Sequence, residues 1–205
     1  MYRRIRWILY GLIAATLLLS AGAWLRESGL VQLGGSGLGI SASVAVGGPF
    51  SLTDDHGQAV TDATYRGRWM LIYFGYTFCP DVCPTELQTI AGALDKLGAQ
   101  ASTVAPLFIT IDPERDTPAA LANYVKLFDD RLIGLTGTPE QIASVARAYR
   151  VYYAKVTPKD SSSYLMDHSS FLYLVDPGGK LRSLFRPGMS AQELADGIRA
   201  NMATS

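Results

Sequence analysis

The chain has 205 residues, with 18 basic and 18 acidic side chains, a hydrophobic fraction of 48% and only two cysteines. This length and apolar content suffice for a folded domain with its own core. They exclude wholesale disorder, a collagen-like repeat and a disulfide-dense mini-protein. The net charge of the whole chain is zero, but the charges are unevenly distributed. Residues 1–27 hold four Arg and one Glu, whereas the rest holds 14 basic and 17 acidic side chains. This mildly acidic body, without a basic run, argues against nucleic-acid binding as the main activity.

The N-terminal segment predicts a membrane anchor. Residues 7–25 form a run of 19 residues without a charged side chain, close to the roughly 20 that a helix needs to cross a bilayer. Three arginines precede this run, whereas an Arg–Glu pair behind it cancels. The positive-inside rule therefore places the N-terminus in the cytoplasm and exports the rest of the chain. We expect a single-pass inner-membrane protein whose C-terminal domain lies in the periplasm or an equivalent space.

A cleavable signal peptide is the alternative for the same segment. Ala21-Gly22-Ala23 has the small-x-small pattern of a cleavage site behind an apolar core. The retained anchor is favoured, because the apolar run continues through Trp24 and Leu25. In both cases the body lies in an oxidising space, where a pair of cysteines can form a disulfide.

The chain divides into three predicted parts: an anchor over 1–27, a tether over 28–48 and a folded domain over 49–205. The tether is assigned because residues 28–48 contain seven Gly and four Ser, a composition typical of flexible linkers. The folded domain alternates apolar strand patterns with amphipathic helix patterns.

The predicted elements of the folded domain follow one another without an internal repeat. In chain order they are a hairpin over 50–61, a buried strand over 69–74, a helix over 84–97, a buried strand over 104–111, helices that begin at the capping residues Thr117, Thr138 and Ser190, and a hairpin over 171–185 between the last two helices. This order predicts an α/β, thioredoxin-like fold, with a central mixed sheet flanked by helices.

Both cysteines lie where a buried strand ends and a helix begins. If Pro84 is the first helical residue, Cys83 occupies the cap position and Cys79 lies in the loop before it. The free N–H groups and the positive end of the helix dipole favour a thiolate there and lower the thiol pKa. Two thiolates four residues apart can converge on one metal ion or close a small disulfide loop. The spacing therefore predicts metal or redox chemistry rather than two unrelated buried thiols.

A histidine is expected beside the two sulfurs. Redox oxidoreductases of this fold typically place two residues between their cysteines and a cis-proline opposite them, whereas this chain has three residues and, at the proline's place, Asp167-His168-Ser169. Two thiolates and the His168 imidazole suit Cu(I), and Cu(II) with a weak fourth ligand. Structural zinc is disfavoured because a closed site needs four protein ligands. The other histidine, His56, is expected to be exposed in a turn.

Several neighbours of these residues are candidates for supporting roles. Asp81 and Asp167 are candidates to orient a ligand by hydrogen bonding, without being ligands themselves. Tyr76 and Phe78 are expected to flank the site and limit solvent access, while the other nearby aromatic residues are assigned to the core.

The segment after the second buried strand contains paired carboxylates. An acid–base role for Asp112 and Asp116 is conceivable, but a structural role is favoured. In that interpretation Asp116 and Thr117 cap the next helix, and Arg115 pairs locally after a turn at Pro113.

Three motifs together resemble the Sco/SenC family. They are Phe-Gly-Tyr-Thr-Phe-Cys-Pro-Asp-Val-Cys-Pro over 74–84, Ile-Asp-Pro-Glu-Arg-Asp-Thr-Pro over 111–118 and Asp-His-Ser over 167–169. The resemblance covers about residues 49–202, and the anchor matches as well. It implies a membrane-anchored copper protein that takes part in assembling cytochrome c oxidase, with Cys79, Cys83 and His168 as the copper ligands.

The expected function is therefore a copper chaperone and not an enzyme. One copper ion would be delivered, by this resemblance, to the copper A centre of subunit II of cytochrome c oxidase, with other exported copper chaperones or thiol oxidoreductases as further candidate partners. The alternative is a thiol-disulfide reductase that keeps the subunit's cysteines reduced, because a Cys79–Cys83 pair that binds Cu(I) also exchanges with disulfides. A peroxiredoxin-like peroxidase is a weaker third interpretation, since the fold allows it but nothing signals a peroxide site.

Overall fold

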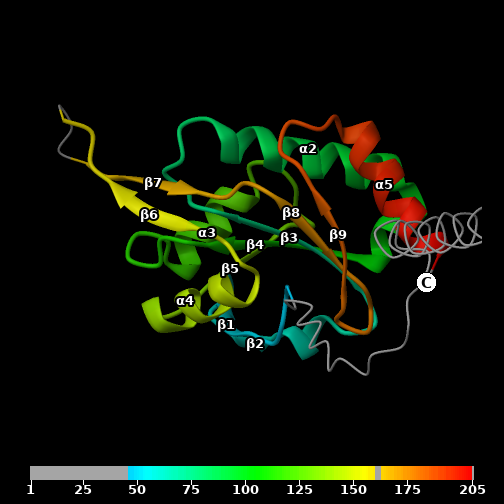
Figure 1. The fold of residues 1–205 in the computed structure, drawn as a ribbon, viewed down its shortest axis with the longest axis horizontal. Helices are drawn as coiled ribbons and strands as arrows, with labels where there is room; N and C mark the ends of the chain where they lie inside the picture. The colour runs from blue at the N-terminus through cyan, green and yellow to red at the C-terminus, as the bar shows by residue number, and fades with distance from the viewer. Residues whose placement is uncertain (1–45, 160–162, 205) are drawn as a thin grey trace, which may run out of the picture. The chain divides into compact units, whose positions relative to one another are not determined.

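The structure is a computed structural model that describes residues 46–159 and 163–204 (Figure 1). The predicted anchor over 1–27 and most of the tether over 28–48 lie outside these residues. Within the described ranges, no helix combines the length and the apolar composition that crossing a membrane requires. The membrane topology therefore stays a prediction.

The body is built on a seven-stranded mixed sheet with the order β2-β1-β5-β4-β3-β8-β9 (Figure 1). Its strands are β1 (Ser51–Asp54), β2 (Ala59–Thr61), β3 (Trp69–Gly75), β4 (Val104–Thr110), β5 (Ile133–Thr136), β8 (Leu172–Val175) and β9 (Leu181–Phe185). β3, β4 and β5 are parallel neighbours, whereas the strands on either side of them pair antiparallel. All seven residues of β3 and of β4 are buried, which explains their continuous apolar runs. The predicted central mixed sheet is confirmed.

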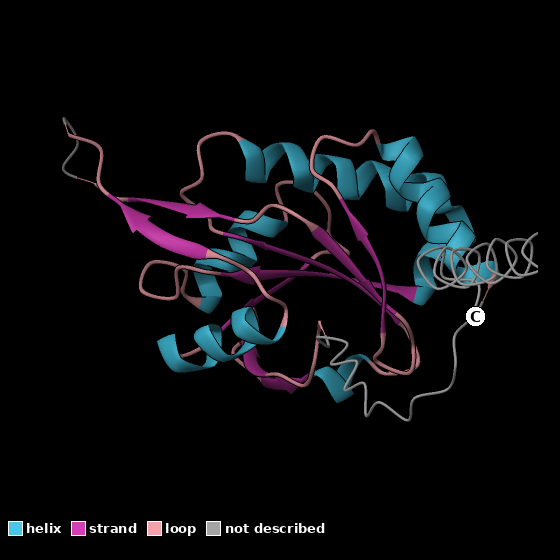
Figure 2. Ribbon diagram, viewed as in Figure 1, coloured by secondary structure: helices cyan, strands magenta, loops and turns pink. Residues whose placement is uncertain are grey.

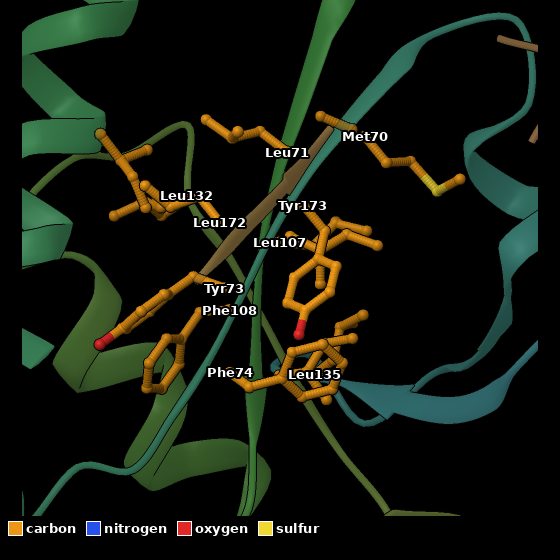
Figure 3. Close-up of a cluster of buried hydrophobic side chains, with 14 of the residues drawn as sticks. Met70, Leu71, Tyr73, Phe74, Leu107, Phe108, Leu132, Leu135, Leu172 and Tyr173 are labelled. Carbon is orange, nitrogen blue, oxygen red and sulfur yellow. The ribbon is translucent and has the colours of Figure 1, made fainter. Parts of the chain in front are cut away.

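Helices cover both faces of this sheet (Figure 2). They are α2 (Val82–Leu97), α3 (Pro118–Val125), α4 (Pro139–Ala148) and α5 (Ala191–Ala203), with short 3₁₀ segments at Asp62–Tyr65 and Gly98–Thr103. Because successive strand residues point to opposite faces, Tyr73 of β3 reaches Cys83 of α2, whereas Phe74 packs on Tyr149 at the end of α4. Figure 3 shows the two rings on opposite sides of the strand. The Tyr73 face is the one that carries the candidate site.

The helix starts largely follow the predicted caps. The hydroxyls of Thr117, Thr138 and Ser190 each accept the N–H of the residue three positions on, and capping boxes are present at Thr138 and Ser190. The start of α2 was predicted wrongly, because the helix begins at Val82 and not at Pro84. A proline is tolerated throughout the first helical turn, where no N–H is needed. Cys83 is therefore the second helical residue and not the cap.

A second sheet was not predicted. β6 (Tyr153–Val156) and β7 (Leu165–His168) form an antiparallel two-stranded ribbon, with Tyr153 opposite His168. Figure 1 shows this ribbon running out from the body. Because His168 is the last residue of β7, it lies at the end of the ribbon that joins β8. No cis peptide bond occurs in the described residues, including the segment where redox enzymes of this fold carry a cis-proline.

Candidate metal centre

Three side chains from three elements converge on one point. The sulfur atoms of Cys79 and Cys83 and a ring nitrogen of His168 all lie within 4.8 Å of one another. Cys79 belongs to the loop between β3 and α2, Cys83 to the first turn of α2, and His168 to the end of β7. Within 46–159 and 163–204 this is the one group of three or more such side chains that could hold a metal ion. The residues predicted as ligands are thus brought together.

The last residue of β3 makes room for the sulfur atoms. A Cβ on Gly75 would lie 2.9 Å from the Cys83 Sγ and 2.7 Å from a ring carbon of Phe108, closer than real Cβ atoms approach other heavy atoms. Glycine therefore allows the first turn of α2 to pack its cysteine directly against the strand. As a result Cys83 is fully buried, whereas Cys79 retains 8% exposure.

Hydrogen bonds and burial shift the pKa values of the two cysteines in opposite directions. The Cys79 Sγ accepts the main-chain N–H of Cys83 at 3.5 Å. Hydrogen bonds from the Cys83 thiol, from His168 and from main-chain N–H groups hold the pKa of Cys79 well below its usual value, although burial opposes them. The bond to Cys79 and burial raise the pKa of Cys83. Of the two sulfurs, Cys79 is therefore the one that favours the thiolate form, whereas Cys83 favours the thiol.

The histidine presents its Nε2 atom to the sulfurs. Nδ1 lies 3.0 Å from the carbonyl oxygen of Ser169, and Nε2 lies 3.6 Å from the Cys83 Sγ. Because a carbonyl oxygen only accepts hydrogen bonds, Nδ1 donates to Ser169, and Nε2 is the ring nitrogen that faces the sulfurs. Tyr73 and Tyr76 meet the ring edge-on, with centroids 6.3 and 6.0 Å away. The imidazole is thus held with Nε2 directed at the sulfurs, the orientation that a metal ligand needs.

The supporting residues named from the sequence behave differently. Asp81 and Asp167 are exposed, and Asp81 contacts Cys79 through its main-chain N–H. An orienting role for their carboxylates stays a prediction. Tyr76 is buried against His168, as expected, whereas Phe78 is 59% exposed. His56 is exposed, as predicted.

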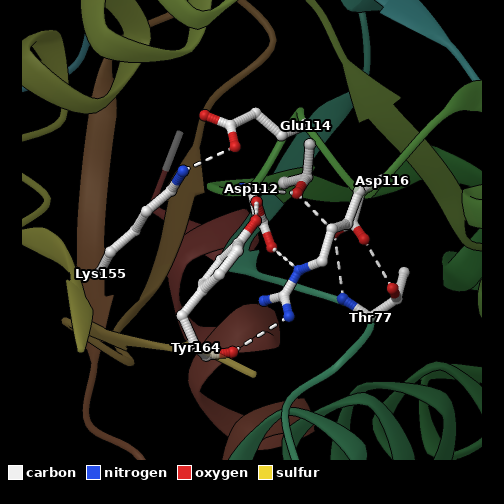
Figure 4. A network of polar contacts seen from close by, with 8 residues as sticks. Thr77, Asp112, Glu114, Asp116, Lys155 and Tyr164 are labelled. Carbon is white, nitrogen blue, oxygen red and sulfur yellow. Dashed lines mark hydrogen bonds and ion pairs between the residues drawn. The ribbon is translucent and has the colours of Figure 1, made fainter. Parts of the chain in front are cut away.

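Asp116 does not cap the next helix, which corrects the prediction. It is fully buried and accepts three hydrogen bonds: from Thr77 N at 3.0 Å, from Thr77 Oγ1 at 2.5 Å and from Thr110 Oγ1 at 2.6 Å (Figure 4). Thr117 alone supplies the cap. Burial raises the pKa of Asp116, and the three donors partly offset this. The carboxylate therefore fastens the loop two residues before Cys79 to the end of β4.

Arg115 pairs with Asp112, as predicted, but its reach is longer than the sequence indicated. It also donates from Nη1 to the carbonyl oxygen of Tyr164 at 3.0 Å, and the Tyr164 hydroxyl donates to Asp112 at 2.8 Å (Figure 4). Tyr164 directly precedes β7. The segment after β4 therefore contacts both the cysteine loop and the histidine ribbon.

The comparisons with known proteins agree on one family. A family model described as SCO1/SenC matches residues 40–203. The mitochondrial SCO2 homolog of Bos taurus is 43% identical over 208 residues, covering 98% of this chain and 76% of the bovine protein. The mitochondrial SCO1 homolog of Homo sapiens is 46% identical over 159 residues, covering 77% of this chain and 53% of the human protein. The chain thus spans about half of one curated relative and three quarters of the other.

A solved structure extends this similarity to the fold. The crystal structure of Arabidopsis thaliana ScoI with copper bound superposes with a TM-score of 0.75 at 46% sequence identity. The superposition covers 78% of this chain and 100% of the Arabidopsis chain.

Proposed function

The chain belongs to the SCO1/SenC family, and from this premise we propose that it is a copper chaperone in which Cys79, Cys83 and His168 hold one copper ion. The observation that carries the proposal is the convergence of two sulfur atoms and one imidazole nitrogen within 4.8 Å. Soft thiolates select Cu(I), and imidazole suits both valences of copper. The copper-bound Arabidopsis relative supports copper as the metal.

The donor set fits a cargo ion better than a structural one. Three protein ligands leave a coordination position open, whereas a closed structural zinc site needs four. Cys79 and His168 lie on the more exposed side of the group and Cys83 behind them. A ligand of a receiving protein can therefore approach from the side of Cys79 and His168, and the ion can pass from one set of thiolates to another.

The proposed recipient is the copper A centre of subunit II of cytochrome c oxidase, and the proposed location is the inner membrane. The recipient follows from the family resemblance, with other exported copper chaperones or thiol oxidoreductases as candidate partners. The location follows from the uncharged run over 7–25 behind three arginines. The body would then act on the exported side of the membrane, in the periplasm or an equivalent space.

A thiol-disulfide reductase is the second candidate, favoured by the unequal sulfurs. Cys79 retains 8% exposure, and its pKa is lowered. As a thiolate it can attack a disulfide of a partner, forming a mixed disulfide and releasing one partner thiolate. The buried Cys83 then gives up its proton and attacks Cys79. The products are a Cys79–Cys83 disulfide and a partner with both cysteines reduced.

The two functions are separated by His168→Ala. Loss of a residue that only supports a ligand costs about 10–100-fold in metal affinity, so loss of a ligand costs at least as much. Disulfide exchange depends on the thiolate and its access, so its rate should stay within about an order of magnitude. Copper titration, the Cu(II) absorption spectrum and exchange with a model disulfide measure these effects. His56→Ala, at the exposed second histidine, is the matched control.

Oxidase activity in cells then decides which function is essential. At limiting copper, we expect His168→Ala to fail to restore oxidase activity, whereas His56→Ala restores it. Full activity from a His168→Ala protein that binds copper poorly would reject delivery as the essential task. The reductase function would then replace it.

A further inference from the structure

The ribbon that carries His168 has no hydrogen-bonded strand connection to the central sheet. Within the described residues, β6 and β7 pair with each other and form a sheet of their own. The position of His168 relative to the two cysteines therefore depends on contacts at the base of the ribbon. The ribbon itself is closed at its base by the carbonyl oxygen of Tyr152, which accepts the N–H of Ser169 at 3.0 Å.

Arg115 makes several contacts of this kind. Its guanidinium carbon lies 3.8 Å from the ring centroid of Tyr164, next to β7, and 4.6 Å from that of Phe78, next to Cys79. Its Nη1 donates to the Tyr164 carbonyl oxygen at 3.0 Å, and its Nε pairs with Asp112, which also accepts the Tyr164 hydroxyl. A single side chain thus contacts the segments that carry two of the three proposed ligands.

The ion pair between Arg115 and Asp112 is buried, unlike most surface ion pairs. The Arg115 side chain is 19% exposed and that of Asp112 only 1%. Burying charges is unfavourable unless the geometry is closely matched. A guanidinium meets this condition because it is planar, stacks on aromatic rings and offers five donors in a rigid fork. Lysine keeps the charge but has neither the plane nor the fork.

We propose that Arg115 is a positioning residue that holds the His168 ribbon against the cysteine loop before copper binds. The proposal rests on the proposed function and gives a structural reason for the copper affinity of the site. If only a fraction of molecules has all three ligands assembled, the apparent affinity for copper falls by that fraction. Arg115 keeps the fraction close to one by joining Tyr164 and Phe78.

The test compares Arg115→Met, His168→Ala and the double variant by Cu(I) titration against a competing chelator. We expect Arg115→Met to weaken Cu(I) binding about tenfold, the low end of the range for residues that support a ligand. Because Arg115 acts through His168, it should add less than about twofold in the His168→Ala background, where the cycle isolates their coupling. An equal loss in both backgrounds, or no loss in either, would overturn the proposal.

Lys155→Met is the matched control. Lys155 also lies over the Tyr164 ring, at 4.6 Å, and pairs with Glu114 at 2.6 Å, but both members of this pair are about half exposed. Such surface pairs contribute little. Neither Lys155 nor its partner Glu114 belongs to the cysteine loop. The control should therefore change Cu(I) binding by less than about twofold. A loss as large as that of Arg115→Met would show that the effect is not specific to Arg115 and would overturn the proposal.

Hydrogen exchange of the reduced, metal-free protein separates this inference from the proposed function. Arg115→Met should accelerate amide exchange in β6 and β7 about tenfold and leave β3 and β4 unchanged, because opening would be local. Unchanged protection of the ribbon would overturn the inference even if copper binds. Failure of the unaltered protein to bind copper would instead reject the proposed function. If Arg115→Met does not fold, Arg115→Lys, which keeps a cation beside Asp112, is judged by the same measurements.

Discussion

Replacement of Gly75 by alanine tests whether the sulfur pair depends on close packing against β3. The added Cβ would lie 2.7 Å from a ring carbon of Phe108, 2.9 Å from the Cys83 Sγ and 3.1 Å from a ring carbon of Tyr73. All three residues are fully buried, so none can turn out into solvent. The substitution must therefore displace the Cys83 sulfur, one of the rings or the strand itself.

The expected cost follows from overpacking a filled core. An inserted methyl group of this kind destabilises a protein by about 1–3 kcal/mol. For a domain of this size, 1 kcal/mol lowers the Tm by about 2–4 °C, so Gly75→Ala should lower it by about 2–12 °C. Since the Cys83 Sγ lies 3.6 Å from the His168 Nε2, a displaced sulfur should also weaken copper binding, by about tenfold.

Thermal unfolding followed by circular dichroism and Cu(I) titration measure the two effects. Gly48→Ala is the control, because a Cβ there would meet only the Ala148 Cβ at 3.6 Å, an ordinary contact. It should leave both the Tm and the affinity unchanged. A Gly75→Ala protein that matches the unaltered protein in Tm and copper affinity would refute the packing argument.

Further predictions concern the loop, the sulfurs and the membrane. Asp116→Asn leaves one acceptor oxygen for three donors and should cost about 1–3 kcal/mol in urea unfolding; a change below about 0.5 kcal/mol would contradict the assigned contacts. Because the pKa of Cys79 is depressed, its thiolate persists as the pH falls, and alkylation followed by mass spectrometry should change little between about pH 6 and 8. An ordinary thiol would react roughly 75-fold faster at the upper end, and such a rise would disprove the depressed pKa. Oxidation to a Cys79–Cys83 disulfide should abolish copper binding, since both sulfurs must be thiolates; stoichiometric copper on the oxidised protein would reject these ligands. Protease added from the exported side should leave a membrane-bound fragment, whereas release of a soluble body in cells would support cleavage after Ala23.

The features that the sequence predicts well are governed by neighbouring residues. A hydroxyl followed by proline or, three residues on, by a glutamate predicts a cap, and Thr117, Thr138 and Ser190 all act as caps. The two central strands follow from apolar runs long enough to be buried on both faces. The site could be predicted from the short cysteine spacing together with a histidine at the proline's place in the fold.

The features that the sequence does not predict depend on distant partners. In β6 and β7 only Met166 is buried, and the two strands have no regular apolar alternation, so no local pattern marks the ribbon. The contact of Arg115 with Tyr164 joins residues 49 positions apart, and that of Asp116 with Thr77 joins residues 39 positions apart. Sequence alone shows that donors and acceptors exist but not which ones meet. Only the contact of Asp116 with Thr77 had a signal in the sequence. β3 and β4 are parallel, so the segments that follow them lie at the same edge of the sheet.

For the carboxylates after β4, the sequence predicted a structural role but named the wrong partner for Asp116. Asp112 and Asp116 are 1% and 0% exposed, and each is engaged by donors, Asp112 by Arg115 and Tyr164 and Asp116 by Thr77 and Thr110. A general base needs access to a substrate, whereas both carboxylates are buried and already bonded within the protein. The structural role favoured from the sequence therefore holds, but these residues brace the loop before Cys79 and the ribbon that ends at His168. The three proposed ligands come from three different elements, so no single element can fix their relative positions. Asp112 and Asp116 contribute to this by joining the elements through hydrogen bonds.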